Sequence, residues 1–308
     1  MIKKQTYLIT GGAGFIGSHL ADELIKTGGR VIIVDNLSAG KKENVNKKAV
    51  FYKRDILDPK LAAIFKKERP DIIFHYAAQI DVRKSTKDPI GDAKINILGT
   101  INVLENCRNF KVGKIIFASS VGVYGEPEFL PTKENHPLGP ISPYPITKLT
   151  VEKYLSYYKS LGLDFAALRY SNIYGPRQSS SGEGGVVSIF IDNLLNGKKS
   201  VIYGNGEQTR DFLYVADAVK AALLALKAPS GSIYNVGTGK ETSINKLYKL
   251  IFRDTGNAIH PKKVPPRFGE IKKSCLNSSK IKKELNWRPK WELEEGLKET
   301  RNWFKNKN

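Results

Sequence analysis

A tyrosine and a lysine stand four residues apart in the segment "SPYPITKLTVEKYL", at Tyr144 and Lys148. Four residues are about one helical turn, so a helix over this segment would present both side chains on one face. A phenol beside an ammonium group is a candidate general base, because the positive charge favours the phenolate form. Taken alone, the pair is explained better by a surface tyrosine near a solvated lysine, so its chemistry depends on what else the fold brings to it.

A glycine-rich turn near the N-terminus indicates a second chemical site. In "YLITGGAGFIGSHL", Gly11, Gly14 and Gly17 lie between an apolar strand and a helix. The first glycine permits the tight turn, the second lets the backbone approach a pyrophosphate, and the third allows the helix to pack closely on the strand. The backbone N–H groups at the helix start, including those of Phe15 and Ile16, can hold phosphate oxygens. This context predicts a dinucleotide site rather than a turn that needs glycine for its conformation alone.

The residue that ends the next strand predicts which dinucleotide binds. Asp35 closes "RVIIVD", where a carboxylate can take the ribose hydroxyls, and Asn36 follows it. Its charge would repel a 2′-phosphate, and no arginine follows in "DNLSAG", so we expect NAD as cofactor rather than NADP. Further cofactor-binding candidates stand at later strand ends and in the next long helix: Asp55, Ile56, Ala77, Ala78, Gln79, Asn96, Ser119 and Tyr170. Ordinary packing explains Asp55 and Asn96 equally well.

The segments around these residues alternate between strands and helices. Strands are predicted at "YLIT", "RVIIVD", "AVFYKRDI", "DIIFHYAA", "KIIFASS" and "DFAALRYSNIYG", and a single long helix at "PIGDAKINILGTINVLENCRNF". Such alternation requires crossover connections and therefore a parallel sheet covered on both faces. We expect an α/β fold: a Rossmann-type doubly wound parallel sheet with a smaller C-terminal substrate-binding α/β lobe. Residues 1–175, with a return around 211–238, form the expected NAD-binding domain, and 176–210 and 239–308 form the expected lobe.

Charge and composition argue against several other classes of protein. The chain of 308 residues has 50 Lys and Arg against 30 Asp and Glu, a formal charge of +20. Its lysines are spread among acidic residues without an aromatic-interleaved stripe, so we expect no nucleic-acid partner. We expect no membrane partner, because no apolar run reaches a membrane span. The two cysteines, Cys107 and Cys275, and the scattered histidines indicate no disulfide framework and no metal site, and a cytoplasmic protein is the simplest interpretation.

A resemblance joins the two sites. The motifs that carry it, in family order along nearly the whole chain, are "TGGAGFIG", "HYAAQ", "SSVGVYG", "PYPITK", "LRYSNIYGPRQ", "GNGEQTRDFLYVADA" and "PPRFGEIKKS". They resemble the extended short-chain dehydrogenase/reductase superfamily, most closely its UDP-glucose (UDP-galactose) 4-epimerase branch. The resemblance implies that Tyr144 removes a proton from a sugar hydroxyl as hydride leaves for NAD, that Lys148 binds the nicotinamide ribose, and that Ser120 holds the sugar oxygen.

The same resemblance implies the rest of the cycle. A 4-keto sugar turns over in the pocket, hydride returns to its opposite face, and a tightly bound NAD is regenerated. Related dehydratases and decarboxylases carry acidic residues before the "VYG" tyrosine, where this chain has Val121 and Gly122, so epimerisation is favoured over elimination. A homodimer built on helices over 90–110 and 144–160 is also implied. A UDP-glucuronate epimerase, a net dehydrogenase and a non-catalytic NAD-binding protein remain as alternatives.

On the substrate side the resemblance implies a UDP-sugar site. Its residues are Ser120, Asn172, Val186, Tyr203, Arg210, Arg267, Glu270 and Ser274. Asn172 and the two arginines would bind the diphosphate, with bidentate donors suited to it, and Tyr203 would lie beside the uracil. An ion pair with Asp211 or Asp217 is the alternative for Arg210, and plain packing is the alternative for Tyr203. Ser274 is small where bulk is associated with excluding 2-acetamido sugars, so we hypothesise that UDP-GlcNAc and UDP-GalNAc are also accepted.

Overall fold

The computed structural model describes residues 5–181, 185–253, 259–266 and 271–307, and it is built around a seven-stranded parallel sheet. From one edge to the other the strands are β11 (Ser232–Val236), β6 (Asp164–Tyr170), β5 (Lys114–Ser120), β4 (Ile72–His75), β1 (Thr6–Thr10), β2 (Arg30–Asp35) and β3 (Val50–Lys53). The strand order reverses between β1 and β4, which is where a doubly wound sheet forms its ligand crevice. The predicted Rossmann-type fold is confirmed.

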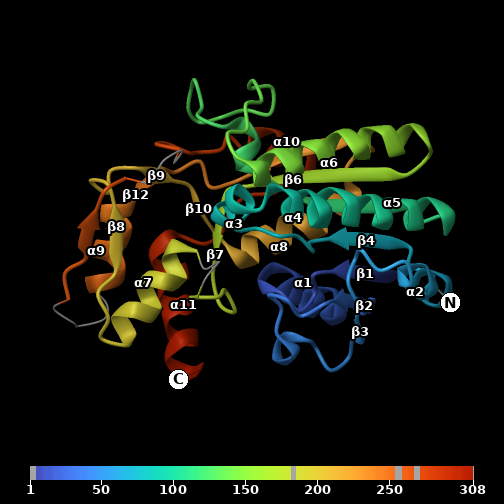
Figure 1. The fold of residues 1–308 in the computed structure, drawn as a ribbon, viewed down its shortest axis with the longest axis horizontal. Coiled ribbons are helices and arrows are strands. Elements are labelled where there is room, and N and C mark those ends of the chain that lie inside the picture. The colour runs from blue at the N-terminus through green and yellow to red at the C-terminus, as the bar shows by residue number, and fades with distance from the viewer. Residues whose placement is uncertain (1–4, 182–184, 254–258, 267–270, 308) are drawn as a thin grey trace.

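Helices cover both faces of the sheet (Figure 1). On one face lie α1 (Phe15–Lys26) and α8 (Val215–Leu224), and on the other α2 (Leu61–Glu68), α5 (Gly99–Asn109) and α6 (Pro143–Ser160). Alternate residues of each strand point to opposite faces, so the sheet has a hydrophobic core on each side. Ile9 and Ile33 pack in the core under α1, and Leu8 and Ile32 pack in the core under α2. None of the helices in the described part of the chain is long and apolar enough to cross a membrane.

The long helix predicted from Pro89 is confirmed, and it contains a π-helical turn that the sequence does not predict. The segment contains α4 (Pro89–Ala93), a π-helical turn (Lys94–Leu98) and α5, and a short helix α3 (Val82–Lys87) precedes it. In the π turn, the Asn96 amide bonds both the backbone N–H and the carbonyl of Gln79, at 2.8 and 2.9 Å. This contact with the end of β4 is tertiary, so no helical periodicity in the sequence could predict the wider turn.

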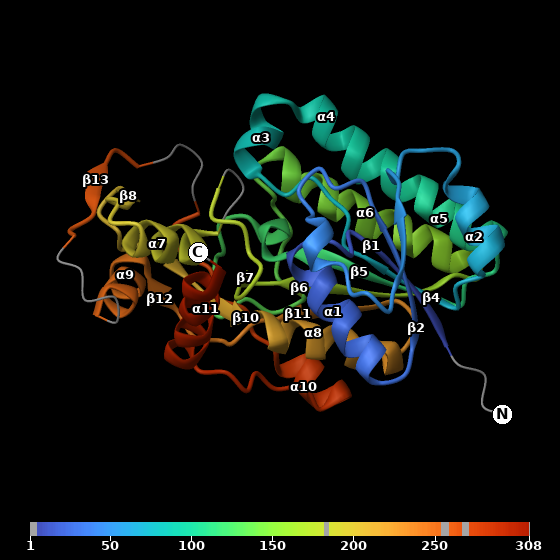
Figure 2. The ribbon, with the colours of Figure 1, turned by 90° about the horizontal axis from the view of Figure 1, so that it is seen from below.

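The C-terminal elements gather at one end of the sheet (Figure 2). They are α7 (Val186–Leu195), β8 (Val201–Tyr203), β9 (Thr209–Arg210), β12 (Thr242–Ser243), α9 (Ile244–Arg253), β13 (Lys262–Val264) and α11 (Leu293–Lys307). The helix α10 (Ser279–Leu285) instead packs on β11. The chain returns to the sheet through β10 (Phe212–Tyr214), α8 and β11. The strand predicted over 164–175 divides into β6 and β7 (Asn172–Tyr174), because the Asn172 N–H turns away to the Asp211 carbonyl and β7 pairs with β10.

Candidate active site

Tyr144 and Lys148 lie on the first turns of α6, as their spacing predicts. Pro143 at the start of α6 favours helix initiation there, and the Tyr144 N–H donates to Ser85 Oγ at 3.2 Å. Lys148 is only 4% exposed, and its Nζ lies 5.8 Å from the centre of the Tyr144 ring and donates to the Ala118 carbonyl at 2.8 Å. Ser120, the last residue of β5, hydrogen-bonds Tyr144. The structure therefore brings Ser120, Tyr144 and Lys148 together.

Burial governs the charge states of this pair. Burial raises the pKa of Tyr144 to about 12, the hydrogen bond with Ser120 opposes that rise, and the charge of Asp92 adds to it. Burial lowers the pKa of Lys148 to about 8, and here the charge of Asp92 acts in the opposite direction. In the protein alone, burial thus outweighs the stabilisation of the phenolate that the spacing of Tyr144 and Lys148 predicts. The phenol stays protonated at neutral pH until a further positive charge enters the site.

The glycine turn has the shape that a dinucleotide pyrophosphate requires. Gly11 has a φ of +71°, and a Cβ on it would lie 2.7 Å from the Ala77 nitrogen at the end of β4. A Cβ on Gly17 would clash with the Gly11 carbonyl, so α1 can pack this closely only on glycine. The first N–H groups of a helix have no acceptor within it, and at the start of α1 those of Phe15 and Ile16 are available to phosphate oxygens. These residues fit NAD.

Carboxylates at the ends of β2 and β3 lie where the adenosine half would bind. Asp35 is 7% exposed and accepts hydrogen bonds from the N–H groups of Ala13 at 3.0 Å and Leu37 at 2.8 Å. Burial raises its pKa, and these two bonds oppose the rise. Asn36 donates to Asp55 at 2.7 Å, so the two predicted neighbours of the adenosine are joined. Ile56 is buried in the core beside them.

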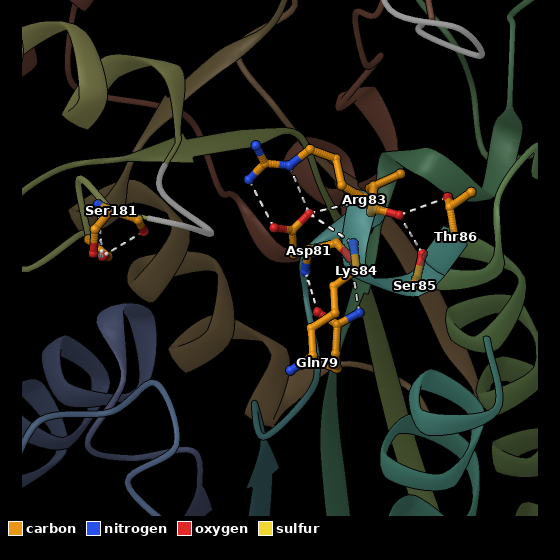
Figure 3. A network of polar contacts seen from close by, with 9 residues as sticks. Gln79, Asp81, Arg83, Lys84, Ser85, Thr86 and Ser181 are labelled. Atoms are coloured by element: carbon orange, nitrogen blue, oxygen red, sulfur yellow. Dashed lines mark hydrogen bonds and ion pairs between the residues drawn. The ribbon is translucent and has the colours of Figure 1, made fainter. Parts of the chain in front are cut away.

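The residues that follow β4 form the polar network of Figure 3. Gln79 is buried, and its side chain accepts from the Asp81 N–H at 2.6 Å and donates to Asp92 at 2.7 Å. Asp81 caps α3 and forms an ion pair with Arg83 at 2.9 Å. Ala77 and Ala78 are half-buried beside the glycine turn and the network. The side chains of Gln79 and Asn96 are thus directed into the protein.

Two other predicted cofactor residues also point inward. Ser119 donates to Glu152 at 2.6 Å, because alternation along β5 turns it away from the side on which Ser120 lies. The Tyr170 hydroxyl bonds Tyr76 at 2.7 Å within the core under α8. Sequence reasoning missed Glu152, which lies one turn after Lys148, and it also missed Asp92. The sequence signal that could have identified them is an acidic residue at a position that the helical repeat places on the buried side of its helix.

Two of the predicted substrate-binding residues have a buried side-chain oxygen without a hydrogen-bond partner among the described residues. Asn172 Oδ1 and Ser274 Oγ are buried, and neither has a hydrogen-bond partner among the described residues. Ser274 is fixed beside Arg210, because its N–H donates to the carbonyl of Thr209 at 3.2 Å. Buried polar atoms are normally satisfied, so these two oxygens are available to a ligand.

The carboxylates proposed as alternative partners of Arg210 have other donors. Asp211 is fully buried and accepts from Thr238, Gly239 and Leu276, and Asp217 accepts from the N–H groups of Lys290 and Trp291. Arg210 donates to the Thr209 carbonyl at 2.8 Å. Tyr203 on β8 and Val186 at the start of α7 are half-buried, and Arg267 and Glu270 lie outside the described residues. Both cysteines are free and buried, and no cluster of metal-binding side chains occurs in the described ranges.

Comparison with known proteins agrees with this geometry. Residues 7–237 match the model of the NAD dependent epimerase/dehydratase family. The UDP-glucose 4-epimerase of Mycolicibacterium smegmatis is 42% identical over 308 residues, which cover 97% of this chain and 98% of that protein. A crystal structure of UDP-glucose 4-epimerase from Thermotoga maritima with UDP-glucose is 46% identical, covers 98% of this chain and 99% of its own, and has a TM-score of 0.97.

A third relative is the UDP-N-acetylglucosamine 4-epimerase of Methanobrevibacter ruminantium, solved in complex with UDP-N-acetylmuramic acid. It is 38% identical, both chains are covered completely, and the TM-score is 0.94. With these relatives the chain is an epimerase-like isomerase acting on carbohydrates, and NAD is its cofactor. The chain belongs to the NAD dependent epimerase/dehydratase family, within the extended short-chain dehydrogenase/reductase superfamily.

Proposed function

We propose that the protein interconverts UDP-glucose and UDP-galactose by epimerisation at C4, through a transient 4-keto sugar. The observation that carries this proposal is the convergence of Ser120, Tyr144 and Lys148 where β5 ends and α6 begins. The names of the relatives support it. Members of the family also include dehydratases, but Val121 and Gly122 supply no acid that could drive elimination.

Each member of this triad has a separate task. NAD, when bound, accepts hydride from the sugar and returns it. Tyr144 takes the proton of the sugar hydroxyl and later gives it back, so it acts as base and then as acid. Ser120 accepts a hydrogen bond from the Gly122 N–H at 3.1 Å, which leaves its own proton to donate to the sugar oxygen. Lys148 would hold the nicotinamide ribose from its buried place behind Tyr144.

The substrate and cofactor would be held by different parts of the chain. We propose that residues 1–175, with the return over 211–238, bind NAD, and that 176–210 and 239–308 bind the UDP-sugar. The unpartnered oxygen of Ser274 and the position of Arg210 beside it support this placement. Asn172 and Ser120 would contact the sugar nucleotide from the NAD-binding part. Tyr203, Val186, Arg267 and Glu270 complete the proposed site.

The proposal is tested by product analysis. Purified protein is incubated with UDP-glucose, UDP-GlcNAc and UDP-glucuronate side by side, and the products are identified by NMR or chromatography while free NADH is followed by absorbance. We expect C4 epimers and no net NADH. Accumulation of NADH would identify a dehydrogenase, turnover of UDP-glucuronate alone would identify a uronate epimerase, and no product with any sugar would leave only a nucleotide-binding protein.

Ser274 sets the expected range of hexoses. Its side chain is small and 6% exposed, so a larger residue at this position would have to extend into the proposed sugar site. We predict that Ser274→Tyr lowers kcat/KM for UDP-GlcNAc selectively, by about tenfold or more, because an acetamido group and a phenol cannot share the space. The matched control is Ser274→Ala, which leaves the space open. An equal loss on UDP-glucose and UDP-GlcNAc in the tyrosine variant would contradict a steric gate at this position.

We further propose that the protein acts as a homodimer in the cytoplasm. Exposed apolar side chains mark one face of α6 and the helices beside it: Ile90, Leu98, Ile146, Tyr154, Tyr157 and Leu161. Those on α6 and at its C-cap, Leu161, are spaced by eight, three and four residues, which places them on one stripe. A second copy packed on this stripe would bury it. Light scattering of the purified protein should give twice the mass of the chain, and a single-chain mass would contradict the dimer.

A further inference from the structure

A buried carboxylate with only neutral donors lies behind the catalytic turn. Asp92 on α4 is 1% exposed. Its oxygens accept hydrogen bonds from Gln79 Nε2 at 2.7 Å, Asn96 Nδ2 at 3.0 Å and Thr147 Oγ1 at 3.1 Å. Burying a carboxylate without a cation bonded to it costs desolvation free energy, so a functional role would explain its presence.

These bonds close a ring around the first turn of α6. Gln79 also holds the Asp81 N–H, and Asp81 caps α3 (Figure 3). From α3, Ser85 Oγ accepts the Tyr144 N–H. The single hydroxyl proton of Thr147 is shared between two acceptors, the Tyr144 carbonyl at 2.8 Å and Asp92 at 3.1 Å. The backbone N–H and carbonyl of Tyr144 are therefore both hydrogen-bonded. The first contact is connected to Asp92 through α3 and Gln79, and the second through Thr147.

The charge of Asp92 acts on the same residues. It favours protonated Lys148 and disfavours ionised Tyr144, both of which face it from α6. From β4 the remaining titratable neighbour is His75, which is neutral, because burial first and the Lys148 charge second lower its pKa to about 3. Asp81 and Asp88 are engaged at the N-termini of α3 and α4. The charge of Asp92 therefore acts on Lys148 and Tyr144 through space, while the hydrogen bond of Lys148 Nζ goes to the Ala118 carbonyl.

We propose that Asp92 is a positioning residue of the epimerase site: its buried carboxylate holds the turn that carries Tyr144, and its negative charge lies behind that turn. This inference rests on the proposed function, since it assigns a role in the same reaction. Asp92 touches neither substrate nor the reacting atoms and acts through Thr147, Gln79 and Asn96. This network also explains the π turn in the helix that follows Pro89, because that turn brings the Asn96 amide to both Gln79 and Asp92.

Asp92→Asn tests both roles. An amide has one acceptor oxygen where the carboxylate has two, so one of the three donors loses its acceptor, and we expect kcat to fall about tenfold with KM little changed. Removing the negative charge makes the phenol easier to ionise and the ammonium easier to deprotonate. Both limbs of the kcat–pH profile should therefore move to lower pH. A residue with a merely structural role would leave that profile in place.

Two further variants separate the roles and guard against a folding defect. Thr147→Val removes the link to Tyr144 but keeps the charge, so kcat should fall with no shift in the pH profile. Asp217→Asn is the matched control, because Asp217 is 3% exposed and also accepts several hydrogen bonds, from Lys290 and Trp291. It should lose stability without a shift of the profile.

The tyrosinate absorbance of NAD-bound protein, with Tyr144→Phe as the blank, gives a readout that does not need turnover. In Asp92→Asn, Tyr144 should ionise at lower pH than in the unchanged protein. An unaltered kcat and unaltered titration in that variant would overturn the proposal, as would an unaltered kcat in Thr147→Val if Asp92→Asn does not fold. Failure of the proposed function is distinguishable, because the unchanged protein would then not epimerise while the titration would still report on Asp92.

Discussion

Tyr144→Phe should lower kcat for epimerisation by about a hundredfold to ten-thousandfold, which is the range that a positioned acid–base group contributes. The change removes one oxygen and keeps the ring, so the packing of α6 on the sheet is preserved. The reaction needs that oxygen twice, first to take the sugar hydroxyl proton and then to return it. NAD binding should survive, because the glycine turn and Asp35 lie on other elements. Bound NAD and kcat are measured on the same preparation.

Tyr157→Phe on the same helix is the control. Its side chain is 58% exposed in the single chain. Phenylalanine keeps the ring that the proposed dimer would bury, so loss of the hydroxyl should leave kcat unchanged. The pH dependence adds a second check: Tyr144 works as a base only when ionised, so kcat should rise as pH increases through its pKa in the complex. Without ligand that pKa is about 12, and positive charge entering the site should lower it. Unchanged turnover in Tyr144→Phe would refute the assignment of the base.

Local patterns were enough to predict the sheet and to place Tyr144 and Lys148 on one helix face, whereas the chemistry of that pair is implied by the resemblance and stays a prediction. The strand–glycine–helix context fixes Gly11 and Gly17 because each glycine answers a steric demand within a few residues or against the next strand end. Tyr144 and Lys148 follow from the helical repeat alone, and Ser120 follows from its place at a carboxyl edge. In each case the required geometry is set by one element or by the general rule that parallel strands end together.

What the sequence could not predict depends on which way a side chain turns. Ser119 and Ser120 are the same residue type at neighbouring positions of one strand, and the sequence does not show which of the two faces Glu152 on the packed helix. Asn96 turns to Gln79 because of a π turn that tertiary contact stabilises. Asp92 looks like any helix-surface acid until the fold is known. Polar residues that support a site therefore escape a pattern search, although they fix its geometry.

The largest loss of stability should come from breaking the buried ion pair between Arg169 and Glu152, which lies beside β5. Arg169 on β6 and Glu152 on α6 are 3% and 2% exposed, and the guanidinium donates twice to the carboxylate, at 3.0 and 2.6 Å. Arg169→Met leaves that carboxylate buried without its cation. We expect the free energy of unfolding to fall by about 3–5 kcal/mol, measured by urea denaturation.

Two comparisons decide whether burial is the reason. In Arg108→Met the partner Glu105 is 39% exposed at its side chain, so water replaces the lost cation and the loss should be about 0–1 kcal/mol. The double change Arg169→Met with Glu152→Gln removes the uncompensated charge and should recover part of the stability. Because Glu152 also holds Ser119, one residue before Ser120, kcat should fall in Arg169→Met even where the protein is fully folded. If Arg169→Met cost no more stability than Arg108→Met, the Arg169–Glu152 pair would behave as a solvent-exposed ion pair. The proposal that this pair fixes the end of β5 through Ser119 would then be contradicted.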